Sequence, residues 1–219
     1  MFIEKIMIIM PALLRGTIPL LKLFILTVVL SIPLGLPFAL GGISKFPPFK
    51  FIARTYIWIF RGTPLLLQLY FFCYGLPILL QPIWPDFGKE FSRFNAALVT
   101  FVLNYAAYFA EIYRGGIESI DKGQYEASKA LGFSPWQTMR LVILPQTIKR
   151  IIPPVSNEII TLVKDTALVT AVAVPELLKA AKDYVNREVD TTAYFFAALI
   201  YLALTFVLTV ISQRLEKRF

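Results

Sequence analysis

The side chains best suited to chemistry are the ionisable and polar residues that interrupt long apolar segments. A charged side chain at the centre of a membrane-spanning helix costs about 2.5–3.5 kcal/mol on insertion scales, so it needs a partner or a purpose. We therefore treat these residues as candidates for contact with a polar substrate. They are Asp165, Glu158, Glu111, Asn104, Tyr108, Thr161 and Lys164.

The spacing of these residues sorts most of them into two helical stripes. Glu158, Thr161 and Asp165 share one helix face, from which Lys164 points away. The second stripe comprises Asn104, Tyr108 and Glu111. Two polar faces on helices otherwise surrounded by lipid should turn toward each other or toward a partner subunit.

Each candidate also has a structural interpretation that stays open at this point. Glu111 could pair with Arg114 one turn later, and Lys164 could neutralise an acid on another helix. Asn104 and Tyr108 could make hydrogen bonds that only pack helices together.

The sequence contains no recognisable catalytic constellation. It has no histidine, and the single cysteine, Cys73, lies in an apolar run. No glycine-rich phosphate loop with a following lysine is present, and no nucleophile stands beside a base. We expect no enzyme activity, no metal site and no cofactor in this chain.

Composition indicates a membrane protein. Hydrophobic residues make up 57% of the 219 residues, against about 45–50% in soluble domains, and the mean hydropathy is +0.67. We expect an all-α membrane protein forming a single domain, residues 1–219. Its start carries Glu4 and Lys5 and lacks a small-residue cleavage site, so no removable signal peptide is predicted.

Apolar runs predict about five transmembrane helices, each needing about 20 mainly apolar residues. The start, Phe2–Leu14, is edged by charges and suits a helix lying along the interface. The second span is expected to extend backward through Tyr56–Phe60, and Pro154 and Pro175 bracket the fourth. The spans are Thr17–Leu40, Leu65–Leu80, Phe94–Tyr113, Pro154–Val174 and Ala193–Ile211.

The distribution of basic residues sets the orientation. Thirteen lysines and arginines fall on the side that holds residues 114–150 and the C-terminus, and eight fall on the other side. The positive-inside rule puts the first group in the cytoplasm and the loop Gln81–Arg93 outside. The net charge of +8 is thus a topology signal, and its spread over separate loops argues against nucleic-acid binding.

A polar stretch inside residues 114–150 reads as two capped helices. Gly132 stands at the expected end of the first helix, where a residue with left-handed backbone geometry commonly closes a helix. Ser134 and Gln137 form a capping box for the second helix, with Pro135 in its first turn. The second helix is expected to continue until Pro145 interrupts it. A solvated amphipathic loop is the plainer alternative, but the caps and breakers all agree with one stiff corner.

This stretch resembles the "EAA" loop of permease subunits of ABC importers, and flanking motifs resemble the polar amino acid branch of that family. The resemblance covers residues from about Gly16 to Arg218, with Ser128 and Val142 where the family usually has alanine and isoleucine. The motifs are Glu126-Ala127-Ser128 with Gly132 and Val142-Ile143-Leu144-Pro145, Arg61-Gly62-Thr63-Pro64-Leu65-Leu66, Tyr108-x-x-Glu111-x-x-Arg114-Gly115-Gly116-Ile117, Gly123-Gln124-x-Glu126-Ala127 and Lys164-Asp165-Thr166-Ala167-Leu168.

The resemblance implies partners that this chain alone lacks. They are a separate ATP-binding ABC subunit, a second permease subunit forming a homodimer or paralogous heterodimer, and an extracytoplasmic amino acid binding protein, all at a prokaryotic cytoplasmic membrane. Closure of the ATPase would push on the loop and drive alternating access. The residues expected to dock on the ATPase are Tyr125, Glu126, Ala127, Ser128, Leu131, Gly132 and Phe133.

The surplus of acids in the spans predicts the substrate. Glu158, Asp165 and Glu111 would be costly uncompensated and favourable around a cationic guest, so arginine, lysine or histidine is expected. For Arg61-Gly62-Thr63-Pro64, a helix start at a membrane boundary competes with a gating or docking role. A self-contained ion- or proton-coupled carrier or channel is the alternative function, although five spans show no repeated halves.

Overall fold

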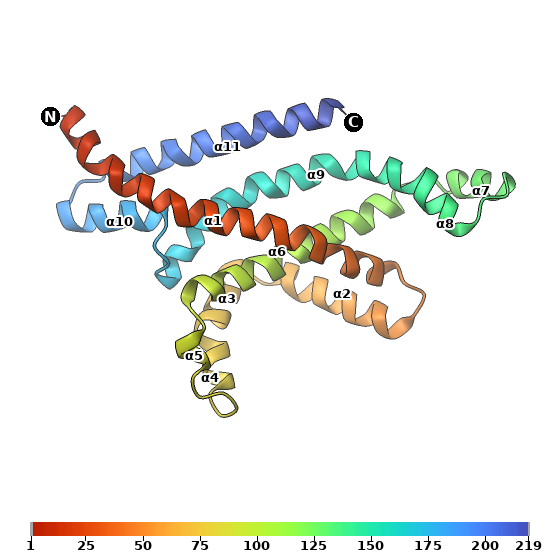
Figure 1. Ribbon diagram of the computed structural model, residues 1–219, viewed down its shortest axis with the longest axis horizontal. Helices are drawn as coiled ribbons and strands as arrows, with labels where there is room; N and C mark the ends of the chain where they lie inside the picture. Colours follow the sequence, from red (N-terminus) through yellow and green to blue (C-terminus); the bar gives the residue numbers. More distant parts are fainter. Residues whose placement is uncertain (1, 219) are drawn as a thin grey trace.

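The computed structural model describes residues 2–218, and the regular structure within this range is entirely helical, as predicted (Figure 1). The ends of the predicted domain, Met1 and Phe219, lie outside the described residues. The α-helices are α1 (Phe2–Ile43), α2 (Pro47–Gly62), α3 (Leu65–Tyr70), α4 (Leu76–Leu80), α5 (Phe87–Glu90), α6 (Arg93–Glu118), α7 (Lys122–Ala130), α8 (Pro135–Gln137), α9 (Leu144–Asp165), α10 (Leu177–Glu188) and α11 (Thr192–Arg218). The other helical segments are the π-helical turns Phe71–Gly75 and Thr138–Ile143 and the 3₁₀ segment Thr166–Val172.

The N-terminal segment differs from the prediction. The expected interfacial helix Phe2–Leu14 and the expected span Thr17–Leu40 form one helix, α1. It runs through Pro11, Pro19, Pro33 and Pro37, although Pro33 and Pro37 were expected to break the span. Prolines are tolerated in such helices because neighbouring helices and serine or threonine side chains take up the freed backbone groups. Inside α1 the Ser31 hydroxyl donates to the Thr27 carbonyl at 2.6 Å.

Length and composition qualify three of the described helices as membrane spans, in α1, α6 and α11. The two helical stretches Pro47–Gly62 and Leu65–Leu80 add a fourth span if they are counted together. The predicted span Pro154–Val174 lies in α9 and the 3₁₀ segment after it, and α9 is too polar to qualify on composition. Its place in the membrane therefore stays a prediction.

The predicted second span is not straight. The helix axis turns by 103° between Gly62 and Leu65, so Tyr56–Phe60 cannot extend the Leu65–Leu80 segment as one rod. Pro64 holds φ at −59° and ψ at 133°, an extended geometry that ends α2 and precedes the first turn of α3. Figure 1 shows α3, α4 and α5 as an arm directed away from the other helices.

The helix after the polar corner also differs from the prediction, because Pro145 does not interrupt it. Residues 135–165 form one continuous helical path in which the π-helical turn Thr138–Ile143 stands directly before Pro145. A wider turn leaves room for a proline ring and for the missing N–H bond. Pro153 and Pro154 lie inside α9, so the helix begins before the predicted span Pro154–Val174 does.

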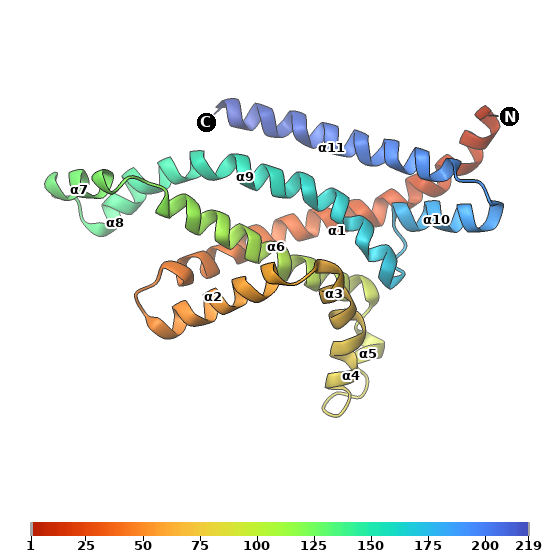
Figure 2. The ribbon, with the colours of Figure 1, turned by 180° about the vertical axis from the view of Figure 1, so that it is seen from behind.

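The helices form an elongated molecule whose two ends differ. In both views α7 and α8 lie at the end opposite to α10 (Figures 1 and 2). Helix α1 packs along α6 and α10, and α9 packs on both α6 and α11. Helices α6 and α9 therefore connect the end that carries α7 and α8 with the middle of the molecule.

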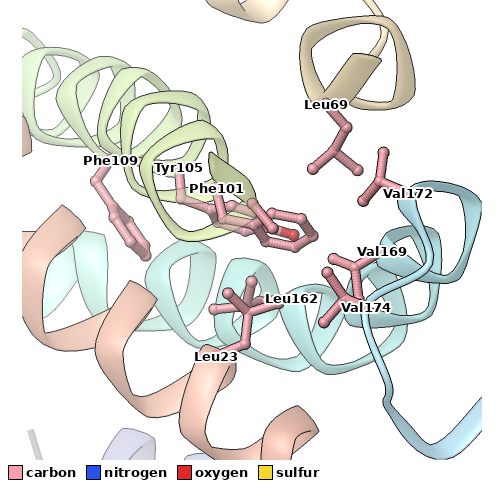
Figure 3. Close-up of a cluster of buried hydrophobic side chains, with 10 residues drawn as sticks. Leu23, Leu69, Phe101, Tyr105, Phe109, Leu162, Val169, Val172 and Val174 are labelled. Atoms are coloured by element: carbon pink, nitrogen blue, oxygen red, sulfur yellow. The ribbon is translucent and has the colours of Figure 1, made fainter. Parts of the chain in front are cut away.

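The main hydrophobic core lies where α1, α3, α6 and α9 meet (Figure 3). Phe101, Tyr105 and Phe109 project from α6 into this core, and Leu162 projects from α9. Tyr105 is almost fully buried, yet its hydroxyl reaches the edge of the core. The core thus fixes the relation between α6 and α9, the two helices that carry the predicted polar stripes.

Candidate functional site

A polar clamp holds the bend between α2 and α3 against α6. The Gln68 amide nitrogen donates to the Phe60 carbonyl at 2.9 Å, to the Thr63 carbonyl at 3.1 Å and to the Thr63 hydroxyl at 2.7 Å. The buried Asn104 amide donates to the Phe60 carbonyl and to the Gln68 side-chain oxygen, both at 3.0 Å. These bonds satisfy the carbonyls that the broken helix leaves free.

Beside this bend lies a cavity of about 420 Å³, which we call the acidic cavity. It brings together five of the seven predicted substrate residues, from both polar stripes. Its lining is Arg61, Gly62, Thr63, Pro64, Leu65, Asn104, Tyr105, Tyr108, Glu158, Thr161 and Asp165. The α-helical spacing on α9 does place Glu158, Thr161 and Asp165 on one face, and that face meets α6 across the cavity.

The two carboxylates of the acidic cavity are sparsely bonded. Asp165 accepts one hydrogen bond, from the Tyr105 hydroxyl at 2.7 Å. Glu158 makes no hydrogen bond and no ion pair with any residue that the structure describes. The cavity therefore presents negative charge that the described residues do not neutralise by direct contact.

A second cavity of about 570 Å³ adjoins the first, and we call it the arginine cavity. Arg61, Gly62 and Tyr108 line both cavities. The lining of the arginine cavity is Arg54, Ile57, Trp58, Arg61, Gly62, Tyr108, Glu111 and Arg114.

Glu111 belongs to the arginine cavity, away from the other acids. The Arg114 guanidinium donates to both of its oxygens, from Nη2 at 2.5 Å and from Nε at 3.0 Å. A nitrogen of Arg61 lies 3.7 Å from the same carboxylate. The structural interpretation of Glu111, a pair with Arg114 one turn later, thus has the geometry in its favour.

Lys164 lies apart from both cavities. Its side chain is exposed and lines a mostly apolar pocket with Leu178, Tyr194 and Tyr201, between α9, α10 and α11. Asp165, its neighbour in sequence, faces the acidic cavity instead. The structure therefore separates Lys164 from the remaining candidates.

The corner formed by α7, Gly132 and α8 has the predicted geometry. Gly132 has φ of +80°, and the Phe133 N–H donates to the Ser128 carbonyl at 3.0 Å, which closes α7. The capping box is complete, with Ser134 accepting from the Gln137 N–H at 3.2 Å and the Gln137 side chain accepting from the Ser134 N–H at 2.8 Å.

The predicted docking residues do not all face outward. Ser128 is buried and its hydroxyl donates to the Gln124 carbonyl at 2.7 Å, and Tyr125 packs on the small core that contains Ile117, Ile120 and Ile143. Glu126, Ala127, Gly132 and Leu131 are exposed, and Phe133 is half-buried. A side chain at Gly132 would touch no described atom within 4 Å, so its requirement for glycine comes from φ and not from packing within this chain.

The residues of the site that were not among the predicted site residues include Gln68, Tyr105 and Arg61. Gln68 was detectable as a polar residue inside the apolar run Leu65–Leu80. Tyr105 reads as an ordinary core aromatic, and only the fold brings its hydroxyl to Asp165. Arg61 stood within a recognised motif, but its position between two cavities depends on the bend.

Comparison with known proteins finds one matching family and several similar permease proteins. Residues 31–219 match the family described as binding-protein-dependent transport system inner membrane component. The arginine transport system permease protein ArtQ of Bacillus subtilis (strain 168) is 38% identical over 95% of this chain and 92% of its own length. The putative glutamine transport system permease protein GlnP of Rickettsia bellii (strain RML369-C) is 35% identical over 93% of this chain and 91% of its own length.

A solved structure extends this likeness to three dimensions. The crystal structure of an amino acid ABC transporter with histidines superposes with a TM-score of 0.89 at 34% identity, covering 99% of this chain and 98% of that one. The likeness of the two folds therefore extends over nearly the whole chain.

Proposed function

The chain belongs to the family of binding-protein-dependent transport system inner membrane components and is a permease of the amino-acid ABC transporter kind, and from this premise we propose that its cargo is a basic amino acid. Arginine, lysine or histidine would place its cationic side chain between Glu158 and Asp165 in the acidic cavity. The observation that carries the proposal is that two carboxylates line one cavity and that, of the two, only Asp165 accepts a hydrogen bond from a described residue, the Tyr105 hydroxyl.

In a membrane, Glu158 and Asp165 would lie away from bulk water. Carboxylates away from water are costly when unpaired and become favourable when a cation binds. Thr161 and Tyr108 line the same cavity and offer hydroxyl groups to the polar ends of an amino acid. The cavity volume of about 420 Å³ is in the range of small-molecule sites.

The names of the similar proteins include an arginine and a glutamine transport system, so they fit both a basic and a neutral substrate. The deciding experiment is uptake into proteoliposomes that contain the permease with its ATPase and binding protein. Asp165→Asn removes one charge at nearly constant shape, and it should reduce arginine transport at least tenfold more than glutamine transport, which corresponds to about 1.4 kcal/mol.

The matched control is Glu118→Gln, which neutralises an exposed acid outside the acidic cavity that is bonded to Arg114. It should leave the ratio of arginine to glutamine transport unchanged. Equal losses of both substrates in Asp165→Asn would place Asp165 in the structural network. A preference of the unmodified transporter for glutamate would remove the basic-substrate proposal.

The proposed transport cycle requires other chains. Two permease subunits, identical or paralogous, would enclose the path, a separate ATPase would hydrolyse ATP, and an extracytoplasmic binding protein would deliver the amino acid. The corner of α7 and α8 is the proposed ATPase-docking element, because its stiff capped geometry and exposed Glu126, Ala127 and Leu131 suit a surface that transmits force. Ser128 and Tyr125 would support that surface from inside.

Gly132→Asp tests the docking element. Aspartate at a φ of +80° adds backbone strain and a charge at the exposed corner, so assembly with the ATPase or coupled transport should fall while membrane insertion stays normal. Gly132→Asn is the control, because asparagine adopts left-handed geometry more readily and adds no charge. Full ATPase coupling in Gly132→Asp would refute the docking role.

The proposed orientation places the corner and the C-terminus in the cytoplasm. Single cysteines at Ile83, which is 84% exposed, and at Lys217 should react oppositely with an impermeant maleimide in intact cells, in a Cys73→Ser background. Ile83→Cys should label and Lys217→Cys should not. The reverse pattern would overturn the orientation. If transport by the purified permease without any ATPase were observed, the self-contained carrier would replace the proposed function.

A further inference from the structure

We propose that Arg61 is a tethered counter-ion that exchanges between Glu111, beside which it lies in this structure, and the acidic cavity, where it neutralises Glu158 and Asp165 whenever no cationic substrate does so. The second half of this inference rests on the proposed function. The first half concerns only the charges of the protein itself and stands or falls separately.

Position gives Arg61 access to both sets of acids. It stands in the last turn of α2, directly before the bend, and it lines both the acidic cavity and the arginine cavity. Of the three arginines that line the arginine cavity, Arg61 is the one that also lines the acidic cavity.

Glu111 does not require Arg61. Both oxygens of Glu111 already accept short bonds from Arg114, whereas the closest Arg61 nitrogen is 3.7 Å away. The Arg61 side chain is 40% exposed, compared with 24% for Arg114. The contact of Arg61 with Glu111 is therefore a loose one, which can be exchanged at small cost.

In the acidic cavity, by contrast, a cation would stabilise the two carboxylates. Glu158 lacks a direct partner among the described residues, and Asp165 has only the neutral Tyr105 hydroxyl. Two carboxylates facing one cavity repel each other unless a cation stands between them. A guanidinium suits this task because it carries a permanent charge and five donors in a planar fork.

Tyr108 provides a surface along which the guanidinium can move. The Arg61 guanidinium carbon lies 5.3 Å from the centre of the Tyr108 ring, and Tyr108 lines both cavities. A cation over an aromatic face is attracted to it, so the region between the two sets of acids is also favourable for the guanidinium.

This arrangement would make Arg61 a determinant of specificity. A substrate with a cationic side chain can replace the guanidinium between the two acids, but a substrate with a neutral side chain cannot. The competition also lowers the affinity of the permease for its own cargo, which favours release after translocation.

The first test is a double-mutant cycle on the empty, purified permease, read by thermal unfolding in detergent. Arg61→Gln should lower the midpoint by several degrees in the native background and leave it unchanged when Glu158→Gln and Asp165→Asn are present. Arg61→Lys should keep the native midpoint. The matched control, Arg54→Gln, removes an arginine of the same cavity and should have equal effects in both backgrounds. Equal effects of Arg61→Gln in both backgrounds would overturn the counter-ion role.

The second test is binding of arginine and glutamine to the same proteins by isothermal titration. Arg61→Gln should tighten arginine binding about tenfold and leave glutamine binding unchanged. Equal weakening of both ligands would overturn the exchange and show that Arg61 holds the substrate carboxylate. If the unmodified permease does not prefer arginine to glutamine, the proposed function fails, while the thermal cycle still decides whether Arg61 neutralises the acids.

Discussion

The acidic cavity and the arginine cavity share three residues but handle charge in opposite ways. In the arginine cavity, Glu111 is bonded to Arg114 through both oxygens, and Arg114 also donates to Glu118 at 2.5 Å. In the acidic cavity, Glu158 has no direct partner among the described residues. Removing one partner of a charge pair within the protein destabilises it, and charges that have no partner are available to a guest.

This difference explains why residues of one helical stripe separate in function. Asn104, Tyr108 and Glu111 share a face of α6, but the bend after α2 divides that face between two cavities. Asn104 donates a hydrogen bond to Gln68 in the polar clamp, Glu111 accepts hydrogen bonds from Arg114, and Tyr108 lines both cavities. The fold therefore places the three residues of this helical face in three different environments.

The largest expected effect comes from the crossing of α6 and α9, which sets the distance between the walls of the acidic cavity. A Cβ at Gly116 would lie 2.2 Å from the Ile151 side chain and 3.2 Å from the Thr147 side chain. Gly116→Val should therefore destabilise the protein by about 3 kcal/mol, the upper range for overpacking, and lower the unfolding midpoint in detergent. It should weaken substrate binding in the folded fraction as well.

Gly115→Val is the matched control for this crossing. A Cβ at the adjacent Gly115 would meet no described atom within 4 Å, so the same substitution should change the midpoint little. A smaller loss in Gly116→Val than in Gly115→Val would show that the close approach of α6 and α9 does not support the fold.

Removal of one acid from each cavity tests the comparison directly. Glu111→Gln removes the carboxylate that accepts two bonds from Arg114 and should cost about 1–3 kcal/mol of stability, the range for a charge-assisted bond. Glu158→Gln breaks no direct bond and should leave the unfolding midpoint unchanged or raised. Thermal unfolding of the two variants side by side measures both. A lower midpoint for Glu158→Gln than for Glu111→Gln would reverse the assignment of structural and functional acids.

Local features of the fold were predictable from the sequence, and the corner of α7 and α8 is the clearest case. Its left-handed Gly132 and its Ser134–Gln137 capping box depend on residues within a few positions of one another. The face shared by Glu158, Thr161 and Asp165 follows from helical spacing alone. All-helical structure followed from composition and from long apolar runs.

Features that depend on distant partners were not predictable. The bend before α3 is stabilised by Gln68 and by Asn104, which is 36 residues further along the chain, so the second span was expected to be straight. Pro145 was expected to end a helix, but a π-helical turn accommodates it. Tyr105 meets Asp165 across 60 residues of sequence. The bend and the Tyr105–Asp165 bond depend on contacts between elements, and the π-helical turn before Pro145 has no signal in the local sequence pattern.

Loosening the bend between α2 and α3 should make the boundary between the acidic cavity and the arginine cavity less well defined. Gln68→Leu removes three donor contacts to Phe60 and Thr63 and the acceptor for Asn104, leaving buried polar groups unpaired at a cost of about 1–2 kcal/mol. The concentration of substrate for half-maximal transport should rise, because Gly62 and Thr63, which line the acidic cavity, lose their fixed position. The exposed Gln81→Leu, in the same arm, is the control and should change neither property. Unchanged transport and stability in Gln68→Leu would show that Pro64 alone fixes the bend.

The smallest expected effect concerns Lys164, which adjoins Asp165 in sequence but lies in a different pocket. Its ammonium group acts on the acidic cavity only across the width of α9, and substitutions of exposed residues away from special features usually stay within about 0.5 kcal/mol. Lys164→Gln should therefore change arginine uptake by less than about threefold, and any change should favour the cationic substrate because a like charge has been removed. Asp165→Asn, measured in the same proteoliposomes, supplies the scale. If Lys164→Gln were as damaging as Asp165→Asn, and for arginine and glutamine alike, the charge balance of the site would extend through α9, and the acidic cavity could not be treated as a separate unit.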